Sequence, residues 1–73
     1  MNYSEIKNLV GTANVTVRSH LRYSELRALV EKAAVMENGI LTIVVELDTL
    51  SYSEIKSLAD VGGRFVSFDL TKI

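Results

Sequence analysis

The sequence predicts an α/β fold in which three tandem helix–strand repeats form a small three-stranded parallel sheet, with strand order 1-2-3 and helices on one face, like a short solenoid. Two observations predict it. An eight-residue phrase occurs three times, at 3–10, 23–30 and 52–59, and a segment rich in β-branched or aromatic residues follows each copy. The chain has 73 residues, enough for a single domain. That domain is expected to span 1–73, with repeats at approximately 2–21, 22–50 and 51–73.

Each copy of the phrase has helical spacing. The copies read YSEIKNLV, YSELRALV and YSEIKSLA, and together they use every tyrosine of the protein. In the first copy Tyr3, Ile6 and Val10 fall at i, i+3 and i+7, which lie on one side of a helix. The other copies keep this spacing. We therefore expect one apolar stripe per helix, with Tyr3, Tyr23 and Tyr52 pointing into the core.

The shared Ser and Glu are interpreted as a signal for helix starts. A capping box has a side-chain acceptor just before the helix and a carboxylate three residues later. The middle copy has Arg22 in the cap position, so Ser24 is expected to cap that helix instead. The alternative is that Tyr, Ser and Glu form a binding feature in each copy. Complete capping pairs occur in the other two copies, as Asn2 with Glu5 and Ser51 with Glu54.

Glycines are expected to end the helices, and strands are expected to follow them. The stops are Gly11, Asn38-Gly39 and Gly62-Gly63, and the expected strands are 13–21, 40–47 and 64–70. Strands separated by helices need crossover connections, so the sheet should be parallel.

Each expected strand has one apolar face and one mixed face. In the middle strand Leu41, Ile43 and Val45 alternate with more polar residues. A sheet covered on both sides would be apolar on both faces, so the helices should cover only one. The uncovered face is interpreted as an interaction surface rimmed by charge, and the alternative is a solvated sheet face with two incidental apolar residues. Its candidate interface residues are Thr16, Arg18, His20, Thr42, Val44, Glu46, Phe65, Ser67 and Asp69.

These features favour a non-enzymatic interaction module. The two outer strands should present unpaired edges, which invite another chain. We expect the protein to associate with itself as a homo-oligomer, or to dock on another protein, through the uncovered face or a strand edge. No cofactor is expected.

The alternative function is a small-ligand or metal binder, or an enzyme, that uses His20, Glu46 and Asp69. These residues share the parity of the uncovered face on neighbouring strands, and a His with two carboxylates could perform acid–base work or hold a metal. The competing interpretation is that Arg18 and His20 only pair with the two carboxylates across the strands.

Composition argues against several other classes. The net charge of −1 provides no field that would attract nucleic acid. The chain has no Cys and one His, which excludes disulfides, thiolate metal sites and multi-His metal cages. The longest apolar run, even when Thr42 is included, is 40–45, far below the roughly 20 residues of a membrane span. Without a charged and apolar leader, a cytoplasmic location is expected.

Overall fold

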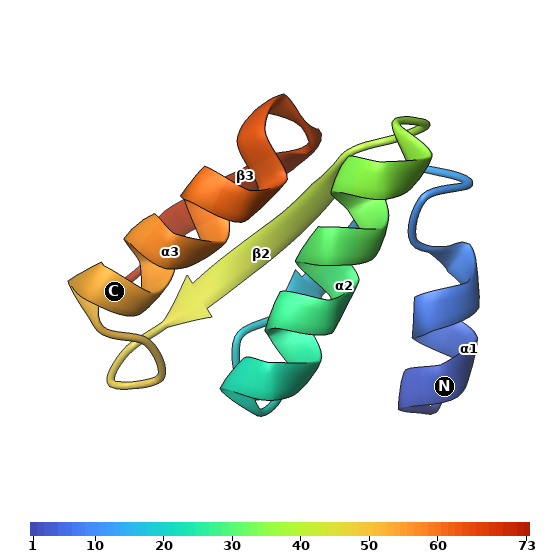
Figure 1. The fold of residues 1–73 in the computed structure, drawn as a ribbon. Helices are drawn as coiled ribbons and strands as arrows, with labels where there is room; N and C mark the ends of the chain where they lie inside the picture. Colours follow the sequence, from blue (N-terminus) through green and yellow to red (C-terminus); the bar gives the residue numbers. More distant parts are fainter.

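Helices and strands alternate along the chain. The computed structural model describes residues 1–73. The strands form one parallel sheet in the order β1-β2-β3, which confirms the predicted α/β class, the parallel sheet and its strand order. All three helices lie on the same side of this sheet (Figure 1). In chain order the elements are α1 (Tyr3–Leu9), β1 (Val15–Arg18), α2 (Tyr23–Met36), β2 (Leu41–Glu46), α3 (Tyr52–Gly62), a 3-10 turn η1 (Gly63–Phe65) and β3 (Val66–Lys72).

The register of the sheet places the predicted apolar residues on the helix side. Val15 of β1 pairs with Leu41 of β2, and Leu41 pairs with Val66 of β3. Along β2 buried and half-buried residues alternate, and Leu41, Ile43 and Val45 are the buried ones. The period of two is the signature of a sheet with one covered face.

The hydrophobic core lies between the sheet and helices α2 and α3. Helix α2 supplies four residues, Leu26, Leu29, Val30 and Ala33, at the stripe positions expected from the sequence. From α1 no residue is fully buried, and Val10, just beyond its end, takes that place. The core is therefore densest in the middle of the molecule and thins towards α1.

The helix starts agree with the sequence in two cases of three. At α1 the Asn2 side chain accepts from the Glu5 N–H at 2.9 Å, and the Glu5 carboxylate accepts from the Asn2 N–H at 3.0 Å. The same reciprocal pair joins Ser51 and Glu54 at α3.

The expected cap of the middle helix was wrong. The N-cap of α2 is Arg22, and Ser24 does not cap this helix because it already lies in its first turn. Only the carboxylate half of the box is made, since Glu25 Oε1 accepts from the Arg22 N–H at 3.1 Å. The Arg22 guanidinium carries only donors, so it cannot accept a hydrogen bond from the Glu25 N–H.

The helix ends differ in detail from the glycine pattern. Glu37 closes α2 in a left-handed conformation with φ 53°, two residues before Gly39. Gly39 has another role, because a Cβ at this position would overlap the backbone carbonyl of Ala13. It lets the loop before β2 approach the loop before β1.

All three strands differ from the predicted ranges at both ends, and two of these differences move a predicted interface residue out of a strand. Strand β1 ends at Arg18, so His20 lies in the following turn. Phe65 belongs to η1, and β3 begins one residue later.

The tyrosines are not equivalent, and the expectation that Tyr52 enters the core was wrong. Tyr3 and Tyr23 are half-buried and pack against the core, whereas Tyr52 is 79 % exposed. The Tyr3 hydroxyl donates to the Glu25 carbonyl of the next helix at 3.2 Å. No helix lies beyond α3 for the Tyr52 ring to reach (Figure 1).

Candidate functional site

The face of the sheet turned away from the helices, here called the open face, carries most of the predicted interface residues. Thr16, Thr42 and Ser67 form one row across the three strands, and the Thr42 and Ser67 hydroxyls are 2.7 Å apart. The next row is Arg18, Val44 and Asp69. Glu46 follows Val44 on the same face of β2.

The open face is polar rather than apolar. Val44 is half-buried between a positive residue of β1 and a negative residue of β3. Ile40, which the same parity places here, precedes β2 and is 43 % exposed. Isolated apolar side chains among hydroxyls and charges are ordinary for a solvated sheet.

Phe65 does not contribute to the open face. Its ring packs against the hydrophobic core, and the Arg64 guanidinium carbon lies 5.3 Å from the ring centroid. The 3-10 turn changes the parity, because residues in a turn do not follow the alternation of a strand.

The three residues of the alternative site are not brought together. His20 Nδ1 lies 3.8 Å from Glu46 Oε1, so this pair forms. Asp69 sits opposite Val44, and its Oδ1 accepts from the hydroxyl and the N–H of Thr71 at 2.6 and 2.9 Å. Those two hydrogen bonds lower the pKa of the Asp69 carboxyl from its ordinary value, and the bond from the Thr71 hydroxyl has the larger effect. No group of three or more His, Cys, Asp or Glu side chains gathers anywhere in the structure.

The register of β3 on β2 explains why Asp69 and Glu46 are not neighbours, because Asp69 pairs with Val44, two residues before Glu46. The pairing of β2 with β3 slips between Val44 and Glu46, so that Glu46 pairs with Lys72. A residue inserted into one strand of a pair bends it and re-aims its side chains. Strict alternation from the sequence cannot anticipate such a slip.

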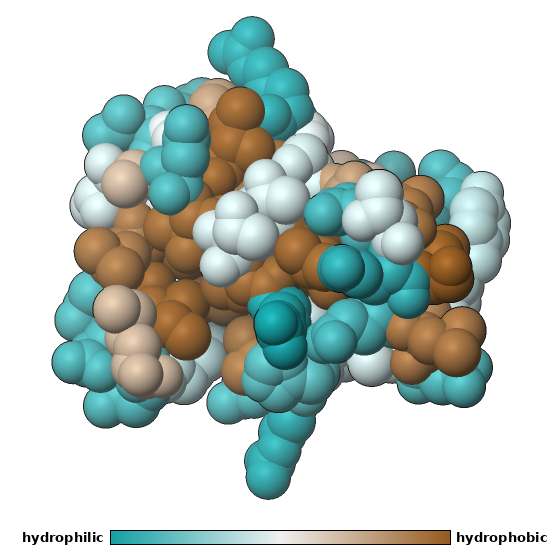
Figure 2. All heavy atoms as spheres, turned by 180° about the vertical axis from the view of Figure 1, so that it is seen from behind, coloured by the Kyte–Doolittle hydropathy of each residue, from teal (hydrophilic) through white to brown (hydrophobic).

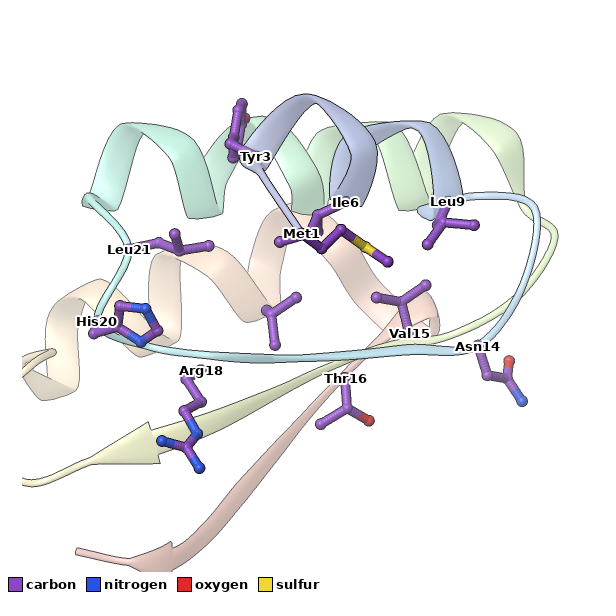
Figure 3. A pocket seen from close by; sticks show the side chains of 11 residues that line it. Met1, Tyr3, Ile6, Leu9, Asn14, Val15, Thr16, Arg18, His20 and Leu21 are labelled. Carbon is purple, nitrogen blue, oxygen red and sulfur yellow. The ribbon is translucent and has the colours of Figure 1, made fainter.

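An apolar groove lies at the β1 side of the molecule, between α1 and the sheet. It encloses about 540 Å³ and is lined mainly by hydrophobic side chains. In Figure 3, Ile6 and Leu9 of α1 point down towards the strand, and Val15 of β1 points up towards the helix. Seen from behind, apolar atoms gather in a hollow on this side (Figure 2). We call this hollow the edge groove, and its apolar walls are Met1, Ile6, Leu9, Val15, Val17 and Leu21.

The outer edge of β1 runs along the edge groove. Val15 and Ser19 donate their N–H groups to the Ile40 and Val44 carbonyls at 3.0 Å. In a parallel pair alternate residues turn their backbone groups to opposite sides. The backbone groups of Thr16 and Arg18 therefore face outward, where no strand lies.

The sequence did not reveal the edge groove as a site. The apolar residues of the groove that belong to α1 and β1 were assigned to the apolar stripe of the helix and to the covered face of the strand. They do lie on those elements, and on the sides that face each other. The apolar spacing of Ile6 and Leu9 is the same as that of core residues in the other helices, so periodicity carries no signal that separates a groove wall from a core.

A scan against protein-family models and searches of curated proteins and solved structures find no match for this chain. In addition, none of its helices has the length and apolar character needed to cross a membrane. The function is therefore proposed from the site alone.

Proposed function

We propose that this chain is a non-enzymatic, cytoplasmic protein-interaction module that binds a protein chain at the edge groove and along the outer edge of β1. The observation that carries the proposal is the apolar hollow of about 540 Å³ beside an unpaired strand edge. The open face would flank this contact with hydroxyls and charges, as the rim of an interface does.

The edge groove combines two means of recognition. An unpaired strand edge offers backbone groups to an added strand, and pockets beside it select the side chains of that strand. Leu9 is 42 % exposed and Met1 85 % exposed at the groove, so apolar surface is available to a partner. Covering it removes apolar area from water, which contributes about 25 cal/mol per Å².

The size of the chain gives a second reason for a partner. A domain of this length buries a modest share of its surface, and its core alone leaves about 3–5 kcal/mol of net stability. Association at the thin side of the core would add stability where α1 supplies no fully buried side chain.

Ligand chemistry at His20, Glu46 and Asp69 is supported less well. Only the pair of His20 and Glu46 meets, and the two side chains are 67 % and 36 % exposed. Water at such an exposed site weakens the electrostatic effects that catalysis needs.

The proposal is tested by blocking the groove with a charge. Leu9→Lys places an ammonium group at the groove mouth on an already exposed position. Val35→Lys is the matched control, since Val35 is an 80 % exposed helical residue outside the groove. Self-association is measured by sedimentation equilibrium. Binding to any co-purifying protein is measured again with both purified components.

We expect Leu9→Lys to weaken the association at least about tenfold, while Val35→Lys leaves it unchanged. Circular dichroism melts check that both variants remain folded. An association that is equally strong in both variants would contradict the proposal, because the bound surface would then lie elsewhere.

A further inference from the structure

We propose that the edge groove receives a second copy of the same chain, whose α3–β3 end docks head-to-tail so that β3 of one copy pairs in parallel with β1 of the next. This inference rests on the proposed function and names its partner. It treats the three helix–strand units as steps of an open stack, in which the end of one copy continues into the start of another.

The backbone edges support this pairing. The Ile40 and Val44 carbonyls point to β1, so the backbone groups of Leu41 and Ile43 point to β3. By the same alternation Val66 and Phe68, the register partners of Leu41 and Ile43, turn their own groups to the outer edge of β3. The outer edge of β3 therefore presents its backbone N–H and C=O groups in the same alternation that β2 presents to β3. The outer edge of β1, where the groups of Thr16 and Arg18 face outward, presents the alternation that pairs with it.

The charges along the two edges are also complementary. Within one copy Arg18, Val44 and Asp69 lie in one row. If the next copy continues in the same register, Asp69 of the first copy comes beside Arg18 of the second. Ser67 would likewise come beside Thr16, as it already lies beside Thr42 with hydroxyls 2.7 Å apart. Opposite charges on neighbouring strands favour one register over its alternatives.

The far end of the molecule presents apolar groups that have no partner. Tyr52 is 79 % exposed, and Leu70, which lies in β3 where its register with β2 shifts, is 49 % exposed. Tyr3 shows what such a tyrosine does when a helix follows, since its hydroxyl donates to the Glu25 carbonyl of α2. In the stacked arrangement Tyr52 would donate to the Glu5 carbonyl of the next copy, and Leu70 would cover the edge groove.

Such a contact joins two different surfaces of the molecule. A contact of this kind leaves a free groove at one end and a free α3–β3 end at the other, so a second and third copy can add. It therefore predicts a mass that grows with concentration rather than a closed dimer.

The decisive experiment uses two variants of the full chain, each blocked at one end. Leu9→Lys blocks the groove and keeps the α3–β3 end, and Tyr52→Lys blocks the α3–β3 end and keeps the groove. Both positions are exposed in the isolated chain, so both variants should fold. Sedimentation velocity is recorded for the wild type, for each variant alone and for an equimolar mixture.

We expect the wild type to form a series of oligomers, each variant alone to be monomeric, and the mixture to form a one-to-one heterodimer. If Tyr52→Lys associates as the wild type does while Leu9→Lys does not, the groove binds something other than this end, and only the head-to-tail inference fails. If both variants associate as the wild type does, the proposed function fails as well. A wild type that stays monomeric overturns the inference and leaves the groove to a foreign protein.

A charge reversal tests the register independently. Arg18→Glu and Asp69→Arg each bring like charges together at the contact, so each alone should associate about tenfold more weakly than the wild type at low salt. Mixing the two variants restores one pair of opposite charges at each contact, and association should return to within about threefold of the wild-type value. A mixture as weak as the single variants would overturn the proposed register.

Discussion

Ser19 shows how one hydroxyl can close the end of a sheet. Ser19 is only 1 % exposed, because it continues the covered face that carries Val15 and Val17. The hydroxyl accepts from the Glu46 N–H at 2.8 Å and lies 2.5 Å from the Thr49 hydroxyl, which donates to the Glu46 carbonyl at 2.6 Å. Every buried polar side-chain atom of the protein has a hydrogen-bond partner, and for Ser19 this network supplies the partners.

Removing this hydroxyl should be costly for its size. Ser19→Ala leaves the Glu46 N–H without its acceptor, while the Thr49 hydroxyl keeps its bond to the Glu46 carbonyl, and an unsatisfied buried group costs about 1–3 kcal/mol. We expect the free energy of unfolding in urea to fall by about that amount, whereas Ser4→Ala on the exposed side of α1 should change it by under about 0.5 kcal/mol. A Ser19→Ala midpoint equal to that of the wild type would show that water replaces the hydroxyl.

At the residue scale the sequence predicts on which face of the sheet a side chain lies, but not which side chains it contacts. It placed Thr16, Thr42 and Ser67 on one face correctly, because a period of two needs only the strand assignment. It could not predict the bond from Ser19 to Thr49, since they are 30 residues apart and meet only through a loop. The shift of Phe65 into η1 depends on a turn for the same reason.

At the scale of elements, the three helices begin with the same tyrosine but with caps of different quality. Asn2 and Ser51 supply a side-chain acceptor, and Arg22 does not. The middle helix is nevertheless the longest, with 14 residues, and the best buried. Packing rather than capping therefore holds α2, as is usual for helices in proteins.

The missing acceptor can be restored. Arg22→Ser would complete the capping box with Glu25, and we expect it to raise the free energy of unfolding by about 0.5–1 kcal/mol. Ser51→Ala, which removes the acceptor from α3, should lower it by about 1 kcal/mol. Both are measured by chemical denaturation. A loss of stability in Arg22→Ser would mean that the arginine side chain contributes packing that its exposed position does not suggest.

The starts of the elements were more predictable than their ends. Each helix begins at the tyrosine of its eight-residue phrase, although the expected cap Ser24 would have placed the start of α2 two residues later. The end of α2 depends on Glu37 in a left-handed conformation, which few non-glycine residues adopt, so a glycine pattern points past it.

At the scale of the whole molecule, stability depends on the layer between α2 and β2. Leu29 is fully buried there, and Leu29→Ala should cost about 2–5 kcal/mol. In a domain of this size that loss is comparable with the whole stability, so we expect Leu29→Ala to be largely unfolded at 37 °C. Leu9→Ala, at a 42 % exposed position, should melt within a few degrees of the wild type. A cooperative, unshifted melt of Leu29→Ala would contradict the core assignment.

The arrangement of the layers was predictable from the sequence, and the edge groove between α1 and β1 was not. Crossover connections and one mixed face per strand lead to a parallel sheet with helices on one side. Whether α1 closes the core depends on how far its side chains reach over β1, and Ile6 and Leu9 stop short of closing it. That is a matter of volumes and distances, which periodicity does not describe.

The register has a consequence for how the chain acquires its structure during synthesis. Val15 pairs with Leu41 and Leu41 with Val66, so each strand pair joins residues about 25 positions apart and no hairpin can form locally. A nascent chain has no sheet until β2 has left the ribosome, and β2 keeps an unpaired edge until β3 follows. Folding should therefore be slower than in a helical bundle of equal length. The interval before residue 66 emerges is when the chain is most open to pairing with a neighbouring nascent copy.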